Sequence, residues 1–600
     1  MGLLGAAYRT YQTQAHRAGV AAEGEKEPLT PVAHIMQNAQ LEITISDAGV
    51  FISAQTVPKE DTKTIIPATI ESAGRTSKPC PHPLCDQLDY LLPGGGEKHE
   101  LYVEQLTQWA ESDDTHPKVR AVLAYVQGGT LLADLTAAGL IEPGDKPDKY
   151  AKQLVRWRVL PKPEDASAEC WRDKTLFDSF ARFYAAQCEK RPKDLCMLSG
   201  QPDIFCETHQ KGVVSLHGNA KLISSKDSAG FAYHGRFAKA SEAFNVGYTS
   251  SQMAHSALRW VAANHGVMMG SRIFLCWNPE GRPVPSLALL GLPPATDKPD
   301  FVSYRQNLLE TLGGYRQKLE PADNVVVAAL DAATTGRLSV TYYNELRGSD
   351  FLDRLERWYD TCCWHSGRYG VQAPSLRRIV SCAFGTEQGE FIKADDRVLR
   401  EHVQQLLPCI LDRRPIPADI LRALVTRAGM PQAYQRANRE TLLETACAII
   451  RKYHTDKEEE WDLALDTSST DRSYLFGRLL AVAEHVERST YSKEETRETN
   501  AIRMQTVFAQ RPMYAWRIIE ERLNPYFARL TPKLRVYYKS IIGEIVENLD
   551  LGAPALNSPL DDVYLLGYYH QRTALFTKKE TSESETSKKE TSATEGKEHE

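Results

Sequence analysis

The hydrophobic pattern of this chain changes near residue 350, and that change constrains the fold more than any single motif. Before it, apolar residues alternate with polar ones or form short buried runs, as in LEITIS, SRIFLCW and NVVVAAL, which is typical of strands. Helical spacing occurs there too, in TLFDSFARFYAAQC and SSQMAHSALRWVAANHG. After it, the spacing is helical throughout. We therefore predict an α+β fold whose large mixed α/β domain spans residues 1–350.

The helical part divides further by composition. We predict a helical connecting region over residues 351–470 and a small C-terminal helical bundle over residues 471–576. The last bundle helix is expected to begin at Ser558, where an N-cap residue precedes Pro559. Residues 577–600 have no hydrophobic periodicity and are expected to be a disordered tail. Within the mixed domain, the Pro-, Ser- and Thr-rich residues 58–92 predict a long loop or lid entering a helix.

Composition sets limits on the class of protein. The net charge of -6 argues against a uniformly basic nucleic-acid binder but leaves local basic patches open. No apolar run approaches the length of a membrane span, and the start of the chain does not resemble a signal peptide. The 12 cysteines occur without a C-x-x-C pair, which suits a reducing compartment. We expect a soluble cytoplasmic protein with no membrane partner.

Two groups of cysteine and histidine are candidate metal ligands. One contains Cys80, His82 and Cys85, and the other spreads from Cys188 to His217. Structural zinc sites use two tight ligand pairs, whereas the first group has a single pair and the gaps in the second are too wide. We predict no metal and no cofactor, with buried free thiols instead.

A search for catalytic motifs finds none of the common ones. The chain has no phosphate-binding P-loop, no H-E-x-x-H and no G-x-S-x-G. The segment PDIFCETHQK offers Asp203, Glu207 and Lys211 as the acid and lysine residues of a divergent metal-dependent nuclease. The spacing of Glu207 and Lys211 does not favour that alternative, so we predict that the chain is not an enzyme.

Charge is unevenly distributed in the predicted bundle. From Asp471 to Ser540 there are thirteen Lys and Arg against eight Asp and Glu, a local balance of +5. The simplest interpretation is a solvated helix face, and the alternative is a basic track for nucleic acid.

Several motifs in order resemble one known family. They are RTSKPCPHPLCDQLDYLL, the block CMLSGQPDIFCETHQKGVVSLHGNAKLIS, AFNVGYTSSQMAHSALRWVAANHG, RRPIP, YLFGRLLAVAEHVE and the final LGYYHQRTALFTKKE. Together they resemble the large subunit of the type I-C CRISPR surveillance complex, Cascade, from about residue 8 to 580. One departure is Asp86-Gln87, where the family has Asn or Asp-Asn.

The resemblance implies a non-catalytic, DNA-binding subunit at the 5′ end of a CRISPR guide RNA. Such a subunit recognises the protospacer-adjacent motif (PAM) in target double-stranded DNA, assists duplex opening, and stabilises the R-loop by holding the displaced single strand. Its other partners would be the Cascade backbone and small subunits and the Cas helicase-nuclease. In this family the C-terminal helical part is also made separately as small subunits.

Candidate contact residues follow from this expectation, because Arg, Lys and Ser side chains bind phosphates or base edges. In the last helix we expect Leu566, Tyr569 and Leu575 to anchor the core, with Tyr568 and His570 facing a partner. The predicted nucleic-acid-binding residues are Arg75, Ser77, Lys78, Lys211, Lys221, Arg503, Arg511, Lys533, Lys539, Arg572, Lys578 and Lys579. The alternatives left open are the nuclease described above and a structural scaffold that does not contact DNA.

Overall fold

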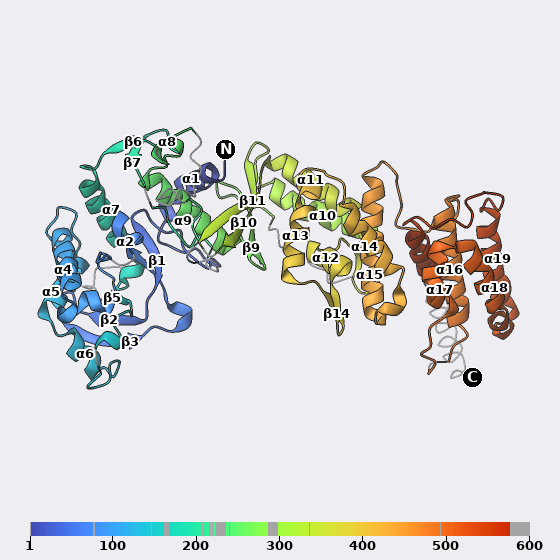
Figure 1. Cartoon of the computed structure of the whole chain (residues 1–600), viewed down its shortest axis with the longest axis horizontal. Helices are drawn as coiled ribbons and strands as arrows, with labels where there is room; N and C mark the ends of the chain where they lie inside the picture. Colours follow the sequence, from blue (N-terminus) through green and yellow to red (C-terminus); the bar gives the residue numbers. More distant parts are fainter. Residues whose placement is uncertain are drawn as a thin grey trace, which may run out of the picture. The chain divides into compact units, whose positions relative to one another are not determined.

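The computed structural model forms two compact units, one of Met1–Leu287 with Ala322–Arg347 and one of Ala288–Pro321 with Gly348–Glu600. The predicted α+β class is confirmed, since every sheet of three or more strands lies before residue 350 and long helices dominate after it (Figure 1). The structure describes residues 2–75, 78–145, 147–160, 167–206, 208–214, 218, 220–223, 236–238, 240–285, 298–334, 336–492 and 494–576.

The first unit mixes short strands with helices. Its helices are α1 (Leu3–Gln14), α2 (Ile70–Ala73), α3 (Leu88–Leu91), α4 (Glu97–Ala110), α5 (Pro117–Gly128), α6 (Leu131–Ala137), α7 (Lys174–Cys188), α8 (Ala240–Ala243) and α9 (Tyr248–His265). Its strands are β1 (His34–Asn38), β2 (Leu41–Ile45), β3 (Phe51–Thr56), β4 (Lys63–Pro67), β5 (Val155–Val159), β6 (Lys193–Leu195), β7 (Pro202–Ile204), β8 (Val267–Met269), β9 (Arg272–Trp277), β10 (Asn324–Thr334) and β11 (Arg337–Arg347).

A four-stranded antiparallel sheet in the order β11-β10-β9-β8 forms one core of this unit. All six residues of β9 are buried, as the apolar run in the sequence predicted. Helices α1 and α9 pack against each other, and α9 also packs against β9 (Figure 1). Residues from α9, β9 and β10, including Trp260, Leu275 and Ala328, share one hydrophobic cluster. This packing fixes α9, which supplies part of the candidate site.

A second core surrounds the three-stranded sheet β3-β2-β5. Strands β2 and β3 form the predicted hairpin, and β5 joins β2 in parallel from more than a hundred residues away. Trp109 of α4, Trp157 of β5 and Phe180 of α7 are fully buried in this core. The prediction of a loop over residues 58–92 is wrong in part, because β4 pairs with β1 in an antiparallel ribbon. Strand β4 therefore holds Lys63 beside Asn38 of β1.

The second unit is mainly helical. Its helices are α10 (Phe301–Arg316), α11 (Gly348–Thr361), α12 (Leu376–Phe384), α13 (Asp396–Leu411), α14 (Ala418–Ala428), α15 (Arg436–Thr455), α16 (Arg472–Arg488), α17 (Asn500–Gln510), α18 (Pro512–Arg529), α19 (Pro532–Glu547) and a last helix over 564–576. Two small hairpins join β12 (Trp364–Ser366) to β13 (Gly370–Gln372) and β14 (Thr386–Gln388) to β15 (Phe391–Lys393). Helix α16 packs against α17, α18 and α19 (Figure 1).

The last helix begins later than predicted. It starts at residue 564 rather than at Ser558, because Arg472 of α16 donates hydrogen bonds to the carbonyl oxygens of Leu556, Ser558 and Pro559. These tertiary bonds hold the residues in turns outside the helix. Among the described residues, no helix is both long and apolar enough to cross a membrane. All twelve cysteines are free thiols.

Two glycines bring the last helix into close contact with α16. A Cβ atom at Gly477 would lie 1.9 Å from the carbonyl oxygen of Tyr564, and one at Gly567 would lie 2.1 Å from that of Tyr474. Real Cβ atoms do not approach oxygen this closely, so only glycine permits the crossing. Leu565 and Leu566, next to the crossing, are fully buried.

We expect Gly477→Ala to lower the unfolding free energy of the second unit by about 1–3 kcal/mol or more. The reason is that the added methyl group would collide with the backbone of the last helix at Tyr564 and Tyr568. Gly543→Ala in α19 is the matched control, since a Cβ there meets nothing within 4 Å. That change should stabilise the helix by about 0.5–1 kcal/mol. Urea unfolding of both full-length variants measures the difference, and equal effects would contradict the close helix crossing.

Candidate nucleic-acid interface

Arg75 is held inside the loop that was predicted to read DNA. Its Nη1 and Nη2 atoms donate to Asp86 at 2.7 and 2.5 Å, and Nη1 also donates to the carbonyl oxygen of Cys80 at 2.9 Å. The guanidinium lies 4.6 Å from the ring centroid of Tyr90. Burial opposes the charge on Arg75, but the hydrogen bonds and charge of Asp86 outweigh it and raise the pKa of the guanidinium. Arg75 therefore closes the loop, and its DNA contact stays a prediction.

Asp86 is the buried centre of the same loop. Its carboxylate is fully buried and also accepts hydrogen bonds from the backbone N–H groups of His82 and Gln87, both at 2.7 Å. Lys78 is exposed on this loop, and Ser77 lies outside the described residues. The loop thus presents Lys78 to solvent while Arg75 is engaged within it.

Lys211 and Lys221 lie together in the structure, although no sequence pattern predicted this pairing. The two residues pair across an isolated antiparallel bridge, and Lys221 also bonds to the backbone of Gly336 and Leu338 beside β11. Partial burial, and then the charge of Lys211, lowers the pKa of Lys221. Two ammonium groups that repel each other are stabilised by a bound anion. This pair is a candidate phosphate contact.

Lys211 also lines a cavity of about 450 Å³, which we call the basic pocket. Its walls come from the β1–β4 ribbon, from α9, from residues 210–213 and from Gly218. The positively charged lining residues are Lys63, Lys211 and Arg259, and within the described part of the chain no Asp or Glu lines it. The pocket therefore offers several cations and amide groups to a ligand with negative charge.

Glu27 holds two of these cations in place. Its buried carboxylate accepts from Lys63 at 2.5 Å and from Arg259 at 3.1 Å. Burial alone would raise the pKa of Glu27, but Arg259 and Lys63 outweigh it and the pKa is lowered. Three positive charges against one negative leave an excess of two around the basic pocket. Lys63 and Arg259 were missed in the sequence, because Lys63 lay in a predicted loop and Arg259 within an unremarkable helix.

Two neutral histidines lie at the basic pocket, of which His255 lines the wall and His209 packs beside it. His209 lies 5.8 Å from His255 between ring centroids, and its Nδ1 is 2.7 Å from the hydroxyl oxygen of Ser251. Burial, and then the charges of His255 and Lys221, lower the pKa of His209 to about 3. Burial also lowers the pKa of His255, which lines the basic pocket. Both imidazoles are therefore uncharged at neutral pH.

Asp203, the leading acid of the nuclease alternative, is engaged at the start of α9. Its carboxylate accepts from the backbone N–H groups of Thr249 at 3.4 Å and Ser250 at 3.1 Å, and from the Ser250 hydroxyl. This is the position of a helix-capping carboxylate. Glu207 lies outside the described residues. Among the residues that are described, no group of three or more His, Cys, Asp or Glu could hold a metal ion.

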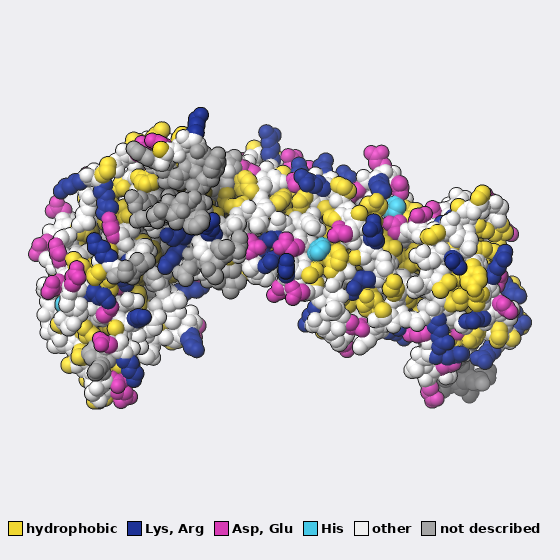
Figure 2. Space-filling model, viewed as in Figure 1, with side chains coloured by type: hydrophobic (Ala, Val, Ile, Leu, Met, Phe, Trp, Pro, Cys, Tyr) yellow, Lys and Arg dark blue, Asp and Glu magenta, His cyan; other side chains and the backbone are white. Residues whose placement is uncertain are grey.

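The predicted cations of the bundle lie on two helices. Arg503 and Arg511 are exposed at α17, and Lys533 and Lys539 are exposed on α19. Both helices pack against α16. Figure 2 shows Lys and Arg side chains mixed with hydrophobic side chains over this bundle. Their nucleic-acid contacts stay predictions.

The last helix corrects part of the sequence analysis. Tyr568 and His570 were predicted to face a partner, and this is wrong because both are buried. Tyr568 donates to Glu484, and His570 contacts Tyr474 at 2.9 Å and stacks on Trp364. Arg572 forms a two-pronged ion pair with Glu440. Lys578 and Lys579 lie outside the described residues.

Comparison with known proteins identifies the class of this chain. The family described as CRISPR-associated protein (Cas_Csd1) matches residues 8–576, almost the whole length. The chain belongs to this family of CRISPR-associated proteins, which confirms the resemblance to a type I-C Cascade large subunit. No curated protein matches the chain.

Arg75→Ala is expected to destabilise the first unit by about 3–5 kcal/mol, because it leaves the buried Asp86 carboxylate without its ion partner. Lys78→Ala on the same loop should change stability by less than about 0.5 kcal/mol. Thermal unfolding of both full-length variants compares them. A neutral Arg75→Ala would contradict the loop-closing role.

The neutral histidines predict loss of stability in acid. The folded pKa of His209 is below its ordinary value of 6.5, so between these two values the unfolded chain binds a proton that the folded chain does not. The stability that the neutral His209 contributes is fully present above pH 6.5. Below pH 6.5 it falls by up to about 1.4 kcal/mol per pH unit. Hydrogen exchange of α9, normalised to the intrinsic rate at each pH, should show this slope. His209→Gln should reduce this slope by up to about 1.4 kcal/mol per pH unit, the effect of one proton. An unchanged slope would show that His209 is not the titrating group.

Proposed function

We propose that this chain is the non-catalytic DNA-binding subunit of a type I-C Cascade complex. It recognises the protospacer-adjacent motif in double-stranded DNA, assists duplex opening and R-loop stabilisation, and helps recruit the Cas helicase-nuclease. Family membership supports the assembly, and the basic pocket is the observation that carries the DNA-binding role. In RNA-guided complexes base pairing reads the target, so the protein needs a short-motif reader and backbone contacts.

In this proposal the basic pocket binds a backbone phosphate. Lys211 is the best placed contact, because it lines the pocket and no Asp or Glu among the described residues forms an ion pair with it, whereas Lys63 and Arg259 share Glu27. Lys221 adds a second charge across the bridge. Phosphate contacts set the position and register of a protein on the duplex, while base contacts select the sequence. Lys78, exposed on the neighbouring loop, is the proposed contact nearer the motif.

The remaining partners follow from the same proposal. The guide RNA and the Cascade backbone and small subunits hold the chain in the complex. The exposed cations of α17 and α19 contact the displaced single strand, which basic grooves bind through its phosphates. Bond cleavage belongs to the helicase-nuclease. The use of Asp203 as a helix cap supports this division, since a metal nuclease would require that carboxylate at its metal.

We expect Lys211→Gln in the assembled complex to weaken binding of motif-bearing duplex DNA by about tenfold at low salt, the effect of one lost charge-assisted contact. The slope of log affinity against log salt should become shallower by about 0.9. A shift assay at several salt concentrations measures both. Lys152→Gln is the matched control, because Lys152 is exposed in the same unit and does not line the pocket.

Equal effects of Lys211→Gln and Lys152→Gln would remove the basic pocket from the proposal.

A separate assay tests the absence of catalysis. The purified chain is incubated with labelled DNA and either magnesium or manganese, and metal-dependent cleavage that Asp203→Asn abolishes would establish the nuclease alternative instead.

A further inference from the structure

The second unit contains a small cavity of about 60 Å³, separate from the basic pocket. Its walls come from the end of α14, the first turns of α15, the last turns of α16, the segment before α17, and the last helix. We call it the arginine cavity, after the five arginines that line it: Arg427, Arg436, Arg439, Arg488 and Arg572. Its volume admits a few water molecules or one small tetrahedral ion.

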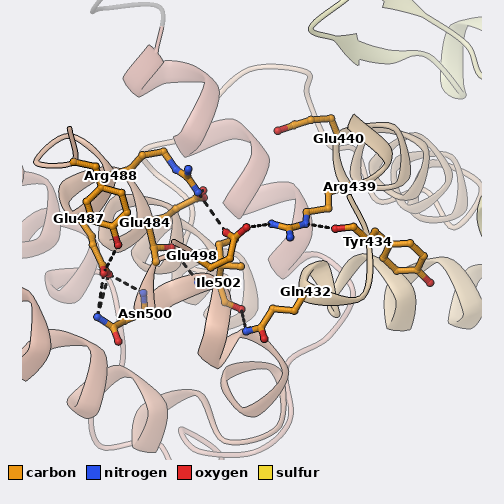
Figure 3. A network of polar contacts seen from close by, with 12 residues as sticks. Gln432, Tyr434, Arg439, Glu440, Glu484, Glu487, Arg488, Glu498, Asn500 and Ile502 are labelled. Carbon is orange, nitrogen blue, oxygen red and sulfur yellow. Dashed lines mark hydrogen bonds and ion pairs between the residues drawn. The ribbon is translucent and has the colours of Figure 1, made fainter. Parts of the chain in front are cut away.

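Three carboxylates line the same cavity, and each has an arginine partner. Glu440 accepts both prongs of Arg572. Glu498 accepts from Arg439 at 2.7 Å and lies 3.7 Å from Arg488 (Figure 3). Glu484 accepts from Arg488 at 3.2 Å. Five positive charges therefore face three negative ones, and two remain without compensation.

The uncompensated charge belongs mainly to Arg427 and Arg436. Arg427 donates to the carbonyl oxygen of Gly385 at 2.7 Å, which leaves its charge unpaired, and its buried Nε has no hydrogen-bond partner among the described residues. Arg436 is exposed at its rim and makes no ion pair with the described part of the chain. The buried Nε of Arg572 lies 3.9 Å from a carboxylate oxygen of Glu484, too far for a hydrogen bond, and has no hydrogen-bond partner among the residues described. Buried donors without acceptors are rare in native proteins and indicate a missing partner.

Glu440 remains ionised and is not available as a donor. Burial would raise the pKa of Glu440, but the hydrogen bonds and charge of Arg572, with Arg436 and Arg488 nearby, lower it. The hydroxyl of Tyr568 donates to Glu484 and so is already used. Ile502, Leu442 and Phe576 complete an apolar part of the wall, where charges interact more strongly than in water.

We propose that the arginine cavity binds a tetrahedral oxyanion, a phosphate group carrying two negative charges. The charge of such a group equals the excess left by the ion pairs. Its oxygens match the paired N–H donors of guanidinium groups. Bound there, it links α15 to α16 and the last helix. Arg439 of α15 and Arg488 of α16 already meet at Glu498 (Figure 3), and Arg572 of the last helix meets Glu440 of α15. This inference does not depend on the DNA-binding role of the first unit.

Calorimetric titration of the full-length chain with inorganic phosphate, in a low-salt chloride buffer, tests the proposal. We expect saturable binding of one phosphate. Arg436→Gln should weaken it by about tenfold and Arg436→Glu by more, since Arg436 adds charge without supporting an ion pair. The matched controls are Arg422→Gln and Arg422→Glu, because Arg422 is exposed on α14 and does not line the cavity. Each control should change the affinity less than about twofold.

Glu498→Gln provides a test in the opposite direction, because it removes a competing negative charge and should tighten phosphate binding. Competition with short oligonucleotides identifies the source of the phosphate group. Displacement by a 5′-phosphorylated trinucleotide, and not by its 5′-hydroxyl form, assigns the site to a nucleic-acid terminus. Displacement by neither assigns it to the free ion. Absence of saturable binding, or equal effects at Arg436 and Arg422, would overturn the proposal.

Discussion

The pairing of buried arginine with carboxylate decides which positive charges of this protein face solvent. Glu42 of β2 accepts from both Arg156 and Arg158 of β5, and Glu444 of α15 accepts from Arg378 of α12. Leaving one partner of such a buried pair alone costs several kcal/mol, so these arginines are committed to the fold. The slightly acidic total therefore conceals two populations of cations. Cations that have no carboxylate partner, or that keep one side exposed while paired, are available to a ligand.

In both the basic pocket and the arginine cavity, positive charges outnumber the carboxylates that pair with them, but the carboxylates are placed differently. Around the basic pocket, Glu27 fixes two cations from behind and leaves their outer sides, with Lys211, toward an open space lined by amides. Around the arginine cavity, the carboxylates lie among the guanidinium groups and enclose a much smaller volume. The larger site has room for a segment of a polymer, whereas the smaller one admits only a single small group.

The local sequence pattern correctly predicted those helices and strands whose own apolar spacing is sufficient to indicate their type. The apolar run of β9 and the spaced apolar residues of α7, α9 and α16 identified each as a strand or a helix. Strand β4 was missed because its pairing with β1 is what orders it, and α17 was not identified as a separate helix within the predicted bundle. The start of the last helix was wrong because bonds from Arg472 outweigh the capping pattern at Ser558. The basic pocket required Lys63 and Arg259, which only tertiary packing brings beside Lys211.

The crossing at Gly477 and Gly567 also has a consequence for biosynthesis. Leu565 and Tyr564 pack against α15 and α16, yet they are made more than 70 residues after α16 ends at Arg488. At typical rates of translation, that interval lasts about 4 to 15 s. During it, the apolar sides of α15 and α16 have no covering helix. The nascent chain is therefore most susceptible to aggregation between the synthesis of α16 and the packing of the last helix against it.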